Sequence, residues 1–116
     1  MKTVDRIFAW ALLVLGFVHF AATFLAFKTL SLDAVWFICG GVAMALAAMI
    51  NLLRMGRTAD RWLTGTCCIA NALMALVFDG VVPWVLRHDL RDNPQVIVVG
   101  LAVFVELVFS VRQWSR

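Results

Sequence analysis

The sequence predicts an all-α polytopic membrane protein in which four transmembrane helices form an up-down bundle. Apolar residues make up 64% of the 116 residues, against about 45–50% in soluble domains. They gather in four stretches, each close to the roughly 20 helical residues that span a bilayer core. None of the stretches shows the alternating segments of about ten residues that are typical of membrane barrels. The stretches are 7–27, 34–53, 63–86 and 95–111.

The connections between these stretches are short and leave no room for a separate soluble domain. They cover residues 28–33, 54–62 and 87–94. Short connections favour antiparallel neighbours in a bundle. We therefore expect residues 1–116 to form a single four-helix transmembrane domain. Any binding or chemistry then takes place at membrane depth or in the connections.

The first stretch follows a short basic segment, residues 1–6, which is also how a secretory signal peptide begins. The apolar core of a signal peptide has about 7–15 residues, and the run 7–27 is longer. Its small residues near the far end alternate with phenylalanines, which does not suit a cleavage site. We expect this segment to stay as the first membrane span.

The later stretches begin after residues that commonly start helices. A proline also interrupts the third stretch: Pro83 comes four residues after Asp79. Because proline lacks the backbone N–H that continues a helix, we expect a kink or an end there. The predicted starting residues are Ser31 and Asp33 for the second stretch, Thr58 and Asp60 for the third, and Asn93-Pro94 for the fourth.

Basic residues are unevenly divided between the two predicted sides of the membrane. The N-terminus, the second connection and the C-terminal tail hold seven Lys and Arg residues, and the other two connections hold three. Basic residues favour the cytoplasmic side, so we expect both termini in the cytoplasm, in an inner (plasma) membrane of the bacterial type. The five tryptophans agree, because four spans place all of them near an interface: Trp10, Trp62 and Trp114 on one side, Trp36 and Trp84 on the other.

The candidate functional residues are the polar groups inside the apolar stretches, because hydrocarbon disfavours them unless they are paired. Each lies on a stripe of small and polar residues at helical spacing, so all can face a common interior. The rise of a helix places one group toward the outer side and one toward the inner side, with an asparagine between them as part of a short polar track. The candidates for ligand or proton binding are His19, Thr23 and Asp79 (outer), Asn71 (middle), and Asn51 and Glu106 (inner).

Several of these residues have alternative interpretations. Glu106 is a proton- or cation-binding carboxylate, or else a neutral acid bonded to Asn51, or one that meets an arginine at the interface. Asp79 either bonds His19 in a proton relay or lies in a wet region and pairs with Arg87 or Lys28. Asn51 and Asn71 either contact a ligand or hold helices together.

His19 is the one candidate metal ligand in the spans. A haem or metal there needs a second ligand from His88, Asp79, a methionine or another protomer. The three cysteines have no C-x-x-C spacing and suit packing better than a disulfide or redox role. No catalytic constellation of nucleophile and base is present, and the sequence does not identify a cofactor.

Four functions fit this pattern, and the last of them is an assembly or accessory protein without chemistry, in which the polar stripes serve packing only. The first is transport or binding of a small hydrophobic or cationic ligand by a homo-oligomer, through the polar interior. The second is a redox subunit that holds haem or quinone near His19. The third is a membrane enzyme that uses His19, Asp79 or Glu106 as an acid or base on a lipophilic substrate. The lipid bilayer is an expected partner. Nucleic acid is not, because the basic residues form no continuous patch.

Overall fold

The computed structural model describes residues 2–116 and is helical throughout, with no strand in that range. Helix α1 covers Lys2–Ala26 and α2 covers Leu32–Gly56. The third span, Arg61–Val85, consists of α3 (Arg61–Ala75), a π-helical segment (Leu76–Val81) and α4 (Val82–Val85). A short 3₁₀ turn, Leu90–Asp92, precedes α5 (Pro94–Trp114). These four spans are long and apolar enough to cross a membrane, which confirms the expected fold class at that level.

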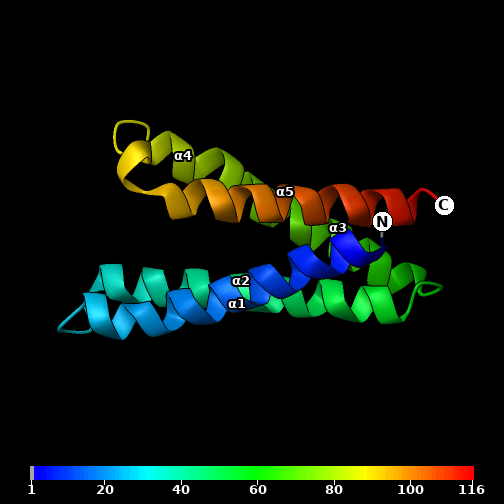
Figure 1. The fold of residues 1–116 in the computed structure, drawn as a ribbon, viewed down its shortest axis with the longest axis horizontal. Coiled ribbons are helices and arrows are strands. Elements are labelled where there is room, and N and C mark those ends of the chain that lie inside the picture. The colour runs from blue at the N-terminus through cyan, green and yellow to red at the C-terminus, as the bar shows by residue number, and fades with distance from the viewer. Residues whose placement is uncertain (1) are drawn as a thin grey trace.

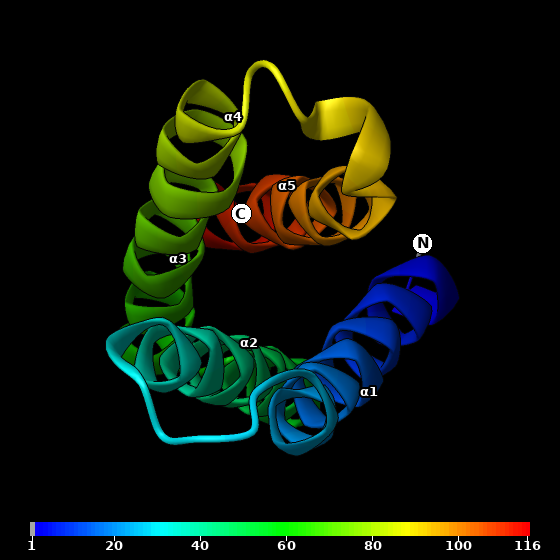
Figure 2. The same cartoon turned by 90° about the vertical axis from the view of Figure 1, so that its left-hand side faces the viewer.

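The four spans pack as a bundle of two helix pairs (Figures 1 and 2). Helix α1 lies along α2, and α5 packs against α3 and the π-helical segment. The pairs approach each other at the end of the molecule where α1 begins and α5 ends, and they diverge toward the opposite end (Figure 1). We call the first of these the terminal end and the second the distal end.

Two glycines bring the backbones of α1 and α2 into direct contact. A Cβ atom added to Gly16 would lie 2.8 Å from the backbone nitrogen of Ala45 and 2.9 Å from the carbonyl oxygen of Gly41. A Cβ atom added to Gly41 would lie 2.9 Å from the carbonyl oxygen of Gly16. Small residues at such crossings are the usual way in which membrane helices gain contact area. The small residues Gly41 and Ala45, four positions apart on α2, therefore pack against α1.

The third span changes its helical register just before Pro83. The backbone N–H of Val82 bonds the carbonyl of Val77, five residues back. Proline cannot donate to the carbonyl four residues earlier, which belongs to Asp79, and its ring would crowd that group. The π-helical turn relieves this conflict. The expected irregularity is confirmed as a π-helical turn, and the helix continues for four residues beyond it.

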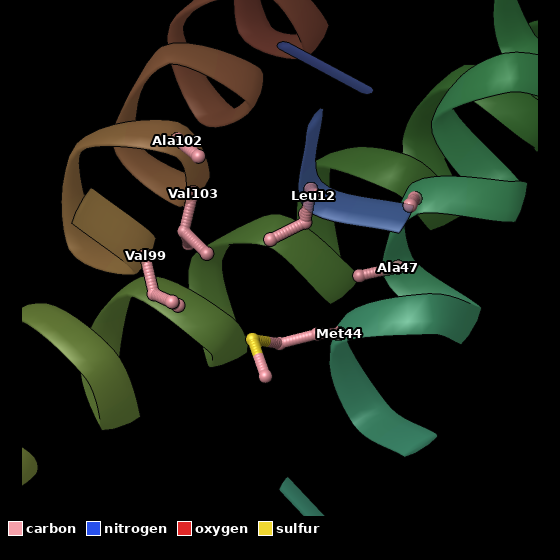
Figure 3. Packing of buried hydrophobic residues seen from close by; sticks show 7 residues of the cluster. Leu12, Met44, Ala47, Val99, Ala102 and Val103 are labelled. Carbon is pink, nitrogen blue, oxygen red and sulfur yellow. The ribbon is translucent and has the colours of Figure 1, made fainter. Parts of the chain in front are cut away.

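A small apolar cluster fills the centre of the bundle, while most large apolar side chains point outward. Figure 3 shows the cluster, which joins α1, α2 and α5. Outside it, Phe17 is 61% exposed and Leu25 is 91% exposed. Because a soluble protein buries such side chains, their exposure suits a lipid environment. The cluster consists of Leu12, Met44, Ala47, Ala48, Val99, Ala102 and Val103.

The helices begin and end close to the expected positions, with one important difference. Ser31 accepts from the backbone N–H of Ala34, and Asp60 accepts from that of Leu63, so these two of the predicted starting residues are confirmed as caps. Helix α5 begins at Pro94 as expected, without a side-chain bond from Asn93. At the terminal end, however, the helices extend past the apolar stretches. Arg54, which the sequence placed in the second connection, lies inside α2 and is 1% exposed.

Candidate functional site

The buried side chain of Arg54 lies at the centre of the largest polar group inside the bundle. Its Nη2 donates to Asp5 Oδ1 (2.6 Å) and to Glu106 Oε2 (3.4 Å). Its Nη1 donates to Gln113 Oε1 (2.7 Å), and its Nε donates to Asn51 Oδ1 (3.3 Å). One guanidinium thus connects α1, α2 and α5. Its planar set of five donors suits several acceptors held at fixed positions.

A reciprocal amide pair connects this group to the third span. Asn51 Nδ2 donates to Asn71 Oδ1 (2.8 Å), and Asn71 Nδ2 donates to Asn51 Oδ1 (3.0 Å). Asn71 Nδ2 also lies within hydrogen-bond distance of the Glu106 carbonyl oxygen and of Ser110 Oγ, at 3.2 Å each. All four spans therefore contribute to one network. We call it the arginine cluster: Asp5, Asn51, Arg54, Asn71, Glu106 and Gln113.

The charges in the arginine cluster do not balance if every group is ionised. Two carboxylates, from Asp5 and Glu106, face the single guanidinium of Arg54. Glu106 is 0% exposed, and its Oε1 atom has no hydrogen-bond partner among residues 2–116. A buried charge without full compensation costs several kcal/mol. One more positive charge at the carboxylates would therefore balance the charges, and one more donor there would give Glu106 Oε1 a hydrogen-bond partner.

An open cavity of about 590 Å³ adjoins the arginine cluster at the terminal end. Arg54, Asp5 and Gln113 line its inner side, together with Thr64. Gln113 Nε2 donates to Thr64 Oγ1 (3.3 Å) and to the carbonyl of Thr58 (3.4 Å). Further basic residues surround the opening: Lys2, Arg6, Arg61, Arg112 and Arg116. We call this cavity the basic pocket.

The outer candidates do not join this site. His19 stacks on Phe37 with ring centroids 3.7 Å apart, and Thr23 donates its hydroxyl to the His19 backbone carbonyl (3.1 Å). Thr23 thus closes a bond within its own helix. Within residues 2–116 there is no group of three or more His, Cys, Asp or Glu side chains that could hold a metal ion. The structure therefore gives His19 a packing environment.

Asp79 lies apart from both His19 and the basic residues with which it was expected to pair. Its carboxylate packs against Gly100 in a shallow groove between the third span and α5. The ion pairs found within residues 2–116 are those of Arg54, so neither alternative for Asp79, a bond to His19 or an ion pair with Arg87 or Lys28, is present among these residues. Arg87 lies over the ring of Trp84 instead.

The expected polar track is interrupted by the apolar cluster. Leu12, Met44 and Val99 lie about two helical turns to the distal side of Asp5, Asn51 and Glu106 on their respective helices. Their side chains meet in the centre of the bundle (Figure 3). The inner candidates Asn51, Asn71 and Glu106 are brought together, and an apolar layer lies between them and His19 and Asp79.

Sequence reasoning missed Asp5 and Arg54 as parts of the site. Asp5 was assigned to the N-terminal segment and Arg54 to the second connection, where charged residues are common. A signal was nevertheless present, because Arg54 follows Asn51 by three residues and Asp5 precedes Ala9 by four. The stripes of small and polar residues therefore continue one helical turn further.

Comparison of the chain with known protein families, with curated proteins and with solved structures gives no match. The arginine cluster and the basic pocket are therefore the features that indicate a function.

Proposed function

We propose that this chain is an integral membrane protein that crosses the bilayer four times in up-down order, with both termini in the cytoplasm, and that it binds a proton on the Asp5–Glu106 carboxylate pair. The observation that carries the binding proposal is the pair itself. Both carboxylates accept from the same Nη2 atom of Arg54, and Glu106 Oε1 has no partner among residues 2–116. One shared proton would leave the group with zero net charge.

A proton suits this position better than a metal cation. Glu106 Oε2 lies 3.4 Å from Arg54 Nη2, so a metal ion at the carboxylate would face a positive charge at short range. The other neighbouring groups are the amide of Asn71, which donates to the backbone carbonyl of Glu106, the thiol of Cys67 and the carboxylate of Asp5. Carboxylates that share one site are well known to hold a proton between them.

We propose that the proton binds from one side of the membrane and does not pass through a single chain to the other side. Polar side chains reach from the terminal end as far as Asn71, where the apolar layer of Leu12, Met44 and Val99 begins. A conducting path would need polar groups or water along its whole length. The position of the site next to the basic pocket supports exchange of the proton with the side that holds the termini.

The charge distribution supports the proposed orientation after one correction. Arg54 is buried in the arginine cluster, so six of the seven basic residues at the terminal end are exposed, against three in the distal connections. This bias still favours a cytoplasmic terminal end. Fusions at the C-terminus test it. Fluorescence from a green fluorescent reporter, without activity from an alkaline phosphatase reporter, is expected, and the reverse pattern would contradict the orientation.

Infrared spectroscopy of the purified protein tests the shared proton. A protonated carboxyl group has a carbonyl stretch that a carboxylate lacks. We expect such a band near neutral pH in the wild type, and we expect it to be lost in both Glu106→Gln and Asp5→Asn, because either change leaves one carboxylate for one guanidinium. The exposed Asp33→Asn is the matched control and keeps the band.

A band that survives in Asp5→Asn but not in Glu106→Gln would show an isolated protonated acid and not a shared proton. Absence of the band from the wild type across neutral pH would refute proton binding at this site. Circular dichroism of each variant establishes that the helices are retained.

A further inference from the structure

The basic pocket has the charge and the polar lining of a phosphate-binding site. Six basic residues line it, and Asp5 is its one acidic residue. Asp5 already accepts from Arg54 at 2.6 Å, so it does not neutralise the residues at the rim. Within residues 2–116, the rim residues Arg6, Arg61 and Arg112 form no ion pair. Like charges held around one cavity repel one another, and a bound anion relieves that repulsion.

The inner wall of the pocket offers hydrogen-bond donors as well as charge. Arg54 Nη1 carries two N–H groups. One of them donates to Gln113 Oε1, which leaves the other as a donor for a ligand. Thr64 adds a hydroxyl to the same wall. Arginine forms paired hydrogen bonds with phosphate oxygens, which makes it the preferred residue for phosphate recognition.

The orientation of the spans in the membrane does not by itself explain this arrangement of basic residues. The preference for basic residues on the cytoplasmic side requires only that they lie near the ends of the spans. It does not require them to converge, from α1, the start of α3 and the end of α5, on one concave cavity with a buried arginine at its inner wall. With the four spans in a bilayer, the ends of the spans lie near the phosphate groups of the lipids, and basic pockets between spans bind the head groups of anionic lipids.

We propose that the basic pocket binds a phosphate group, carried either by the head group of an anionic phospholipid or by a soluble phosphate compound. This ligand class is an anion and differs from the hydrophobic or cationic ligand considered from the sequence. The site uses the rim residues, so it does not depend on the proton that Asp5 and Glu106 are proposed to share.

Two arms of one binding experiment distinguish the sources, using the full chain in detergent. Native mass spectrometry measures retention of phosphatidylglycerol against phosphatidylcholine. Thermal unfolding with inorganic phosphate, against chloride at equal ionic strength, measures a soluble anion. The test variant is Arg61→Gln with Arg112→Gln, at the rim. The matched control is Arg57→Gln with Arg87→Gln, which removes the same charge from exposed positions outside the pocket.

We expect selective retention of phosphatidylglycerol that falls by about thirtyfold in the rim variant and stays unchanged in the control variant. Stabilisation by phosphate without lipid preference, again lost in the rim variant alone, would assign the pocket to a soluble compound. Absence of both effects, or equal loss in the two variants, would overturn the proposal. The infrared band of the carboxylate pair is measured in a separate experiment, so the phosphate proposal and the proton proposal can fail independently.

Discussion

Replacement of Arg54 by methionine tests the main energetic feature of this structure. Arg54 is 1% exposed and donates to Asp5, Glu106, Asn51 and Gln113. Methionine fills part of the same volume but has no donors, so it leaves two buried carboxylates without a counter-ion. Removal of one partner from a buried charge group costs about 3–5 kcal/mol. We expect the free energy of unfolding to fall by that amount.

The assay is reversible unfolding in mixed micelles, followed by circular dichroism. Arg57→Met is the matched control, since Arg57 is exposed and its side chain has no recorded partner among residues 2–116. Its effect should stay within about 0.5 kcal/mol. A triple variant that combines Arg54→Met with Asp5→Asn and Glu106→Gln should recover most of the loss, because it removes the unbalanced charges. Equal stability of Arg54→Met and Arg57→Met would refute the buried cluster, and failure of the triple variant to recover would attribute the loss to packing.

Three further predictions concern packing between helices. Gly16→Ala places a Cβ atom 2.8 Å from the backbone of Ala45, so it should lower the free energy of unfolding by about 1–3 kcal/mol. Gly56→Ala is the control, because a Cβ atom there has nothing within 4 Å, and it should not destabilise the protein in the same micelle assay. Asn71→Leu removes the reciprocal bonds to Asn51 and should cost about 1–3 kcal/mol; an unchanged unfolding curve would contradict a structural role for this pair. A lipophilic maleimide should label the exposed Cys39 at once and label Cys67, which is 0% exposed, only after unfolding; rapid labelling of Cys67 in the folded protein would show that α2 and α3 do not pack as described.

The helices and their approximate limits could be predicted because hydrophobic length and local capping chemistry act over short distances. Ser31 and Asp60 were each one of two candidate caps recognised before their helix, and Pro83 indicated an irregularity in the third span. Small residues at helical spacing were likewise expected where helices pack closely, and Gly16 and Gly41 meet at such a contact. These features depend on neighbours within a few residues of the chain.

The arginine cluster could be predicted only in part, because its decisive contacts join residues that are far apart in the sequence. Asn51, Asn71 and Glu106 were expected in the interior and do meet there. Arg54 was expected in a connection, since a charged residue after an apolar stretch normally faces water. Its inward direction follows from Asp5, 49 positions earlier, which no local pattern reveals. Conversely, a bond between His19 and Asp79 was one of two alternatives because their depths agreed, although equal depth does not bring two helices together.

The most direct test of this account is nuclear magnetic resonance of the arginine side chains in the labelled protein in bicelles. A guanidinium held by two carboxylates and two amides exchanges its Nε–H slowly with water and rotates slowly about the Nε–Cζ bond. We predict that the Arg54 signal shows both properties, while the exposed arginines exchange rapidly, and that Asp5→Asn combined with Glu106→Gln speeds the rotation of Arg54. Rapid exchange and averaged Nη signals for Arg54 in the wild type would contradict a buried arginine cluster.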